Sequence, residues 1–208
     1  MTVEKRTFGS VTEAWEAFDN WLIANWKDGY DSLAPPATDE EIKLLEERLN
    51  VTLTDDYKES LKCHNGQNDY SGIFEGNEYL STEEIYSQWK VWKDLNDDGT
   101  FDDNESTPRE GTGISTKWYD LGWVPITHDG SGDHYCLDLA PDISKNGKVG
   151  QIITMWHDDS DRELLADSFY LFFCKYVNQV LSGETVFSDD YGGLVQKTEL
   201  VDNERYPQ

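Results

Sequence analysis

The spacing of apolar residues changes along this chain, and this change constrains the fold more than any other feature of the sequence. Between residues 10 and 92, large apolar side chains recur at steps of three and four, the period of an amphipathic helix. Between 123 and 156 they fall in short runs separated by Asp, Gly, Ser and Pro, as in strands joined by turns. Helical spacing returns over 168–181. This order predicts an α+β fold, with helices packed against a mainly antiparallel or mixed sheet of about five to six strands.

Helix starts are marked by capping boxes, in which a Ser or Thr is followed three residues later by Glu. Such pairs begin at Ser10, Thr38 and Ser81, and each precedes a helical pattern. The stretch 28–37 contains a glycine and two prolines, so it is expected to be a turn or linker. The expected helices cover residues 10–26, 38–49, 54–64, 81–93 and 168–182.

The expected strands cover residues 123–126, 134–139 and 149–156. In the second of these, Tyr135 and Leu137 alternate with Cys136 and Asp138. Successive side chains of a strand point to opposite faces, so this alternation predicts a strand with two unlike faces.

A chain of 208 residues has the size of one large domain. Aromatic residues make up 13% of it, too many for a disordered acidic protein, so we expect a packed core. We predict a single domain over 1–183, with an N-terminal helical extension over about 1–28. The residues that follow, 184–208, are mostly polar and are expected to form a C-terminal tail.

The chain carries 42 acidic and 17 basic residues, which gives a net charge of −25. A field of this sign repels nucleic acids and anionic membranes and attracts basic partners. We therefore expect a protein partner, no nucleic acid and no membrane; alternatively, the acidity only keeps the chain in solution. Three separate cysteines without a CxxC pair, and the lack of a signal peptide or long apolar segment, favour the cytoplasm.

Several short motifs occur together between residues 33 and 158. They are LAPP at 33–36, NG at 65–66, WVPI at 123–126, DGSGD at 129–133, HYCLDL at 134–139, VGQ at 149–151 and WHD at 156–158. In combination they resemble the SUKH superfamily, which includes fungal cell-wall-assembly regulators and bacterial immunity proteins of toxin systems. The resemblance covers roughly residues 30–181. It implies a SUKH-like α+β domain that binds proteins, with no chemistry to carry over.

Two functions are compatible with this resemblance. The first is an immunity protein that binds and neutralises a cognate toxin, such as a basic nuclease, after electrostatic attraction. The alternative is a regulatory scaffold of the cell-wall-assembly type that binds signalling partners. Neither is an enzyme, and neither requires a cofactor. The two glycines of the DGSGD motif permit positive φ between two strands, so this motif is explained by turn geometry alone.

Residues 94–105 match the calcium-loop pattern, with oxygen-bearing residues at the ligand positions, Gly at the sixth position and Glu at the twelfth. A glycine- and proline-containing segment follows at 106–113, so the second helix of an EF-hand is missing. The alternative is a solvated acidic turn. The candidate calcium ligands are Asp94, Asn96, Asp98, the Thr100 carbonyl, Asp102 and Glu105.

A second group of residues combines imidazoles and carboxylates near the predicted strand ends, and these are types that bind transition metals. Its members are His128, Asp129, Asp133, His134, His157, Asp158 and Asp159. No HxH or HExxH spacing occurs, so polar residues at turns are the favoured interpretation. Cys136 lies inside a strand pattern, and no base stands at a defined spacing from it. No specific motif therefore indicates an enzyme.

Overall fold

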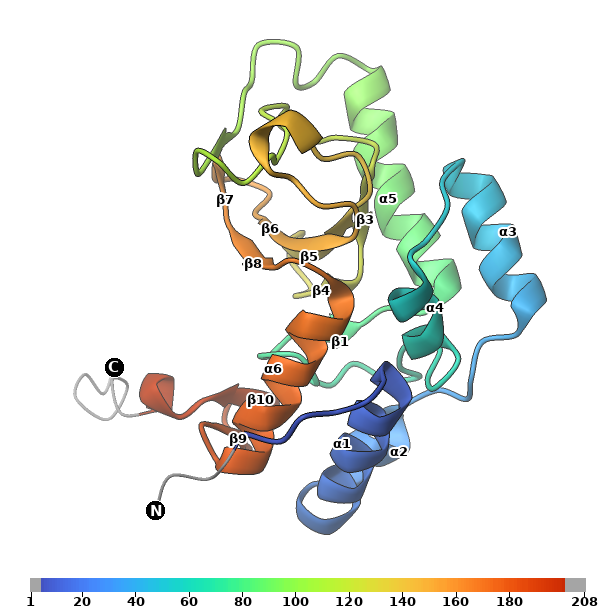
Figure 1. Cartoon of the computed structure of the whole chain (residues 1–208), viewed down its shortest axis with the longest axis vertical. Coiled ribbons are helices and arrows are strands. Elements are labelled where there is room, and N and C mark those ends of the chain that lie inside the picture. The colour runs from blue at the N-terminus through green and yellow to red at the C-terminus, as the bar shows by residue number, and fades with distance from the viewer. Residues whose placement is uncertain (1–4, 201–208) are drawn as a thin grey trace.

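The main sheet in the computed structural model, which describes residues 5–200, is antiparallel and has four strands (Figure 1). Its strands lie in the order β3 (Trp123–Pro125), β5 (His134–Asp138), β6 (Gln151–Met155) and β8 (Leu164–Ala166). The register pairs Leu137 with Val124 on one side and with Ile152 on the other. The predicted α+β class is confirmed.

Within residues 5–200, the other strands pair two by two. These pairs are β1 (Glu78–Tyr79) with β4 (Thr127–His128), β2 (Thr107–Pro108) with β7 (Asp161–Arg162), and β9 (Thr185–Ser188) with β10 (Gly193–Gln196). The β2–β7 pair is parallel and the other two are antiparallel. Within the described residues, the main sheet therefore has four strands, and the other six form three separate two-stranded sheets.

Six α-helices lie wholly within residues 5–200. They are α1 (Val11–Asn25), α2 (Lys27–Ser32), α3 (Asp39–Leu49), α4 (Asp55–Leu61), α5 (Thr82–Asp97) and α6 (Phe169–Ser182), and a 3-10 turn, η1, covers Ile143–Lys145. In Figure 1 the sheet and α5 lie at one end of the molecule, α1 and α2 at the other, and α6 between them. None of these helices is long and apolar enough to cross a membrane.

The predicted capping residues start the helices as expected. The boxes at Thr38 and Ser81 are complete, because each side chain accepts from a backbone N–H in the first turn and the Glu three residues later bonds back. At Ser10 only half of the box forms, since the Glu13 carboxylate accepts from the N–H of Gly9 instead. Gly183 ends α6 in the left-handed conformation that glycine adopts without strain.

An aromatic core joins the first helix to the last. The ring of Trp15 on α1 lies 4.5 Å from that of Phe173 on α6, and both are buried. The Trp15 indole N–H donates to the hydroxyl of Ser60, 2.8 Å away on α4. The segment expected as an N-terminal extension is therefore packed into the same core as the sheet.

Both faces of strand β5 are buried. His134 contacts Trp92 of α5 on one face, whereas Tyr135 contacts Phe172 of α6 on the other. Cys136 and Asp138 are fully buried on the side that faces α5. Helices cover both faces of the strand, so the alternation of residue type separates two buried environments.

Two further expectations need correction. The linker expected at 28–37 contains the short helix α2, whose Gly29 packs directly against the Trp26 ring. The polar tail expected at 184–208 forms the β9–β10 hairpin over 185–196, and Phe187 stacks on Trp26 with ring centroids 4.6 Å apart. Leu194 in this hairpin is fully buried. Residues 201–208 lie outside the described part of the chain.

Candidate functional site

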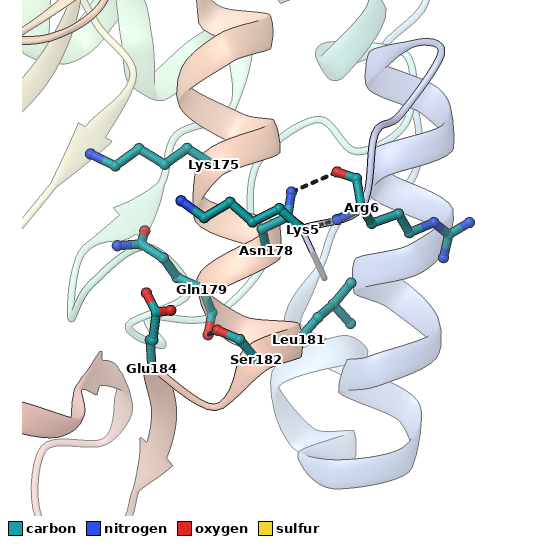
Figure 2. Close-up of a pocket in the computed structure, with 8 residues that line it drawn as sticks. All are labelled: Lys5, Arg6, Lys175, Asn178, Gln179, Leu181, Ser182 and Glu184. Carbon is teal, nitrogen blue, oxygen red and sulfur yellow. Dashed lines mark hydrogen bonds between the residues drawn. The ribbon is translucent and has the colours of Figure 1, made fainter. Parts of the chain in front are cut away.

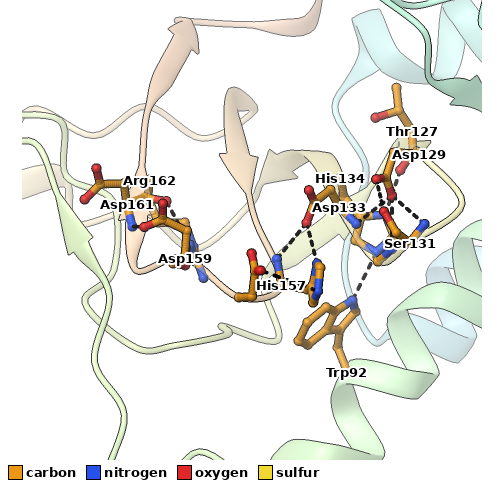
Figure 3. A network of polar contacts seen from close by, with 12 residues as sticks. Trp92, Thr127, Asp129, Ser131, Asp133, His134, His157, Asp159, Asp161 and Arg162 are labelled. Atoms are coloured by element: carbon orange, nitrogen blue, oxygen red, sulfur yellow. Dashed lines mark hydrogen bonds and ion pairs between the residues drawn. The ribbon is translucent and has the colours of Figure 1, made fainter. Parts of the chain in front are cut away.

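The DGSGD turn at 129–133 is closed by its own first carboxylate. One oxygen of Asp129 accepts from the backbone N–H groups of Ser131, Gly132 and Asp133 at 2.8 to 3.0 Å (Figure 3). Partial burial raises the pKa of Asp129, but these hydrogen bonds outweigh it and hold the pKa at about 2. The carboxylate is thus ionised and occupied by its own loop.

His134, the next residue along, is buried at the base of this turn. Its Nδ1 lies 2.7 Å from the carbonyl oxygen of Thr127, and its Nε2 lies 3.1 Å from the indole nitrogen of Trp92. Burial lowers the pKa of His134 to about 4, so the ring is neutral at physiological pH. Both ring nitrogens are engaged, and the imidazole acts as a structural link between the turn and α5.

The remaining histidines of the predicted cluster are only partly brought together. One carboxylate oxygen of Asp133 lies 2.8 Å from the backbone nitrogen of His157 and 2.8 Å from its Nδ1. This contact raises the pKa of His157. Asp158 lies 4.0 Å from the other ring nitrogen of His157. His128 instead stacks on His134, with ring centroids 5.3 Å apart. Between residues 5 and 200, no three His, Cys, Asp or Glu side chains form a group that could hold a metal ion.

The same network contains a buried cation, Arg162, with which no carboxylate of residues 5–200 forms an ion pair. Arg162 donates to the carbonyl oxygens of Asp159 and Asp161 at 2.6 and 2.8 Å (Figure 3). It also donates to the carbonyl oxygen of Trp118 at 2.9 Å. Its guanidinium lies 5.4 Å from the Trp118 ring and 5.7 Å from the Trp123 ring. Burial lowers its pKa. Sequence reasoning missed this residue because an arginine between two acids looks like a solvated strand end.

The predicted calcium loop begins inside a helix. Helix α5 continues through Asp97, so the first loop positions are helical, and the Asp94 carboxylate pairs with Lys90 one turn earlier. Three of the six candidate ligands, Asn96, Asp102 and Glu105, line one hollow of about 240 Å³. The lining of this hollow does not include Asp94, Asp98 or Thr100. Calcium binding stays a prediction.

The Cys136 thiol lies deep in the sheet. It is fully buried, and burial raises its pKa far above the ordinary value. The thiol is therefore protonated at neutral pH and unreactive as a nucleophile. Its position is that of a small apolar core residue.

A larger cavity lies between the N-terminal segment and α6; we call it the α6 cavity (Figure 2). It has a volume of about 470 Å³ and is lined by Lys5, Arg6, Lys175, Asn178, Gln179, Leu181, Ser182 and Glu184. The Asn178 carboxamide holds the segment in place, since it accepts from the Arg6 N–H and donates to the Arg6 carbonyl at 2.7 and 2.9 Å. Arg6 and Asn178 are some 170 positions apart in the sequence, so no local sequence pattern could have predicted this contact.

These observations define an acidic α+β domain in which the histidine, cysteine and buried arginine side chains described above serve the fold. Domains of this kind form the SUKH superfamily. The chain belongs to its SMI1/KNR4 family (SUKH-1), whose model matches residues 36–175.

Three fungal proteins show the same relationship over most of the chain. The glucan synthesis regulatory protein of Neurospora crassa is 24% identical, with 88% of this chain and 41% of the relative aligned. Cell wall assembly regulator SMI1 of Saccharomyces cerevisiae is 25% identical, over 85% of this chain and 42% of the relative. The cell wall biosynthesis/cell cycle regulator smi1 of Schizosaccharomyces pombe is 26% identical, over 88% and 39%. The chain thus spans about two fifths of the length of these relatives.

Proposed function

We propose that this chain is a non-catalytic protein-binding domain that takes part in the regulation of cell-wall assembly. The observation that carries the proposal is the alignment of more than four fifths of the chain with proteins named as regulators of the cell wall. Because the chain corresponds to only part of those relatives, the proposal concerns one domain of such a regulator.

The chemistry of the polar residues supports a binding role. Asp129 is occupied by its own turn, His134 uses both ring nitrogens, and Arg162 is held by backbone carbonyls. Such groups are fixed by the fold and are not poised for proton transfer. The net charge of −25 accelerates encounter with a partner that has a basic surface.

The alternative function is an antidote that neutralises a toxin, and the same charge favours it when the toxin is a basic nuclease. We rank it second because the relatives described above are named for cell-wall regulation. The two functions lead to different consequences when the gene is lost.

The test is deletion of the gene in its source organism, followed by growth with and without a dye that perturbs the cell wall. A regulator predicts a viable strain that is hypersensitive to the dye, and re-expression of the intact chain restores resistance. An antidote predicts lethality that disappears when a neighbouring toxin gene is also deleted. Normal growth of the deletion strain under both conditions contradicts the proposal.

A further inference from the structure

We propose that the α6 cavity binds the phosphate of a phosphorylated serine or threonine in a basic segment of a partner protein. The inference takes the class of partner from the proposed function, but its pocket stands on separate observations. It also assigns a role to the lysines of this cavity, which are basic residues in a strongly acidic chain.

The first observation is that two lysines of the cavity lack acidic partners. Eleven lysine and arginine side chains of the described residues pair with a carboxylate, as a strong excess of acids predicts. Over the same part of the chain, no carboxylate lies within ion-pair distance of Lys5 or Lys175, and both line the α6 cavity. Two uncompensated ammonium groups at one cavity form a local site for an anion.

The second observation is how the side chains lie. In Figure 2 the side chains of Lys5 and Lys175 extend to the same side of α6, while the guanidinium of Arg6 points away toward α1. Arg6 is already engaged, since it lies 3.7 Å from a carboxylate oxygen of Glu13. The Gln179 carboxamide lies below the lysines and can donate to an oxygen of the ligand.

The charge and size of the cavity select the ligand. A phosphate monoester carries a charge of about −1.5 to −2 at neutral pH and has three acceptor oxygens. A carboxylate carries only a single negative charge, so the phosphate is the better ligand for two ammonium groups. A volume of about 470 Å³ exceeds the need of a single ion and accommodates the side chain that carries it. None of the described residues that line this cavity is aromatic, so they offer no platform for a stacked nucleobase.

The field of the whole chain restricts where this phosphate can come from. An anionic membrane presents many negative charges at once, and the net charge of −25 on the chain repels them. A basic segment with one phosphorylated residue satisfies both requirements, because its arginines and lysines are attracted by the acidic chain while its phosphate fits the lysines of the cavity. This argument favours a phosphorylated protein segment over a lipid headgroup.

The test measures binding of fluorescent peptides to the full chain by anisotropy. Two peptides share one arginine-rich sequence and differ only in phosphorylation of a central serine. Non-specific attraction to an acidic protein predicts that the phosphate weakens binding, because it lowers the positive charge of the peptide. The α6 cavity predicts the opposite sign, with the phosphorylated peptide binding about tenfold more tightly.

Variants assign this gain to the cavity. The double variant Lys5→Ala/Lys175→Ala should lose the gain, whereas Lys43→Ala/Lys145→Ala, which changes the net charge equally at exposed positions, should keep it. Glu184→Gln removes the acidic group of the cavity and should strengthen binding of the phosphorylated peptide only. Weaker binding of the phosphorylated peptide, or an equal gain in both double variants, would overturn the inference.

A binding experiment with lipid vesicles tests whether the phosphate comes from a lipid headgroup instead. Binding to phosphatidylserine vesicles that depends on Lys5 and Lys175 would assign the cavity to lipid and overturn the proposal. The deletion experiment tests cell-wall regulation without reference to this cavity, so failure of one proposal is distinguishable from failure of the other.

Discussion

The indole N–H of Trp92 donates a hydrogen bond to Nε2 of His134, 3.1 Å away, and the two rings meet edge to face. The Nδ1 of the same imidazole donates to the carbonyl oxygen of Thr127. An imidazole that donates from one nitrogen and accepts on the other is neutral. A proton added to Nε2 would break the bond from Trp92 and place a charge in the core.

The stability of the protein should therefore depend on the protonation of His134. Its pKa is lowered from 6.5 to about 4 by burial, so the folded state binds fewer protons than the unfolded state between these values. The contribution is fully present above pH 6.5 and is lost as the pH falls toward 4, by about 3 kcal/mol. Urea unfolding at several pH values should show this loss relative to His134→Gln, which does not titrate. A difference between the two proteins that is independent of pH contradicts the assignment.

Arg162 should be required for stability although no carboxylate in the described part of the chain pairs with it. Arg162→Met leaves the carbonyls of Asp159, Asp161 and Trp118 without their donor, and we expect a loss of about 3 kcal/mol in the free energy of unfolding. Arg162→Lys should lose less, because one ammonium keeps part of the hydrogen bonding. Arg109→Met, at an exposed position, serves as the control. Equal stability of Arg162→Met and the unaltered chain would show that the buried charge is dispensable.

The β9–β10 hairpin should behave as part of the core. Leu194 is fully buried, so Leu194→Ala should lower the free energy of unfolding by about 3 kcal/mol. Asp190→Ala, at the exposed turn of the same hairpin, should change it by less than about 0.5 kcal/mol. Chemical denaturation measures both. Similar values for the two variants would mean that the hairpin is detached in solution.

Calcium binding at 94–105 predicts that millimolar calcium raises the melting temperature, because a ligand of the folded state stabilises it by mass action. Helix α5 covers the first loop positions and would have to unwind at Asp94, so the affinity should be weak. Asp102→Ala should abolish the rise, and Asp103→Ala, outside the ligand positions, should not. Identical melting curves in calcium and in a chelator contradict the site.

Local signals predicted the fold where the structure depends on local bonds. A capping box involves residues three apart, and the boxes at Thr38 and Ser81 form as predicted. The end of α5 was misplaced because two ion pairs, Lys90 with Asp94 and Lys93 with Asp97, follow helical spacing and support one more turn. Acidic residues alone therefore did not indicate a loop.

Features that depend on distant contacts were not predictable in the same way. The hairpin that contains Gly193 lies against Gly72, so closely that a Cβ on Gly193 would lie 2.6 Å from the Gly72 backbone. The burial of both faces of β5 was not predictable either, because it depends on helices from both halves of the chain. The α6 cavity joins Lys5 to Lys175, and only the folded chain brings them together.

The packing of Trp15 against Phe173 also bears on how the chain is synthesised. Translation releases α1 well before α6, because more than 140 residues separate the two helices. During that interval the apolar face of α1, with Trp15 and Phe18, has no α6 surface to cover it. The core around Trp15 is thus closed by two helices that are synthesised far apart in time, and it is complete only when both are present.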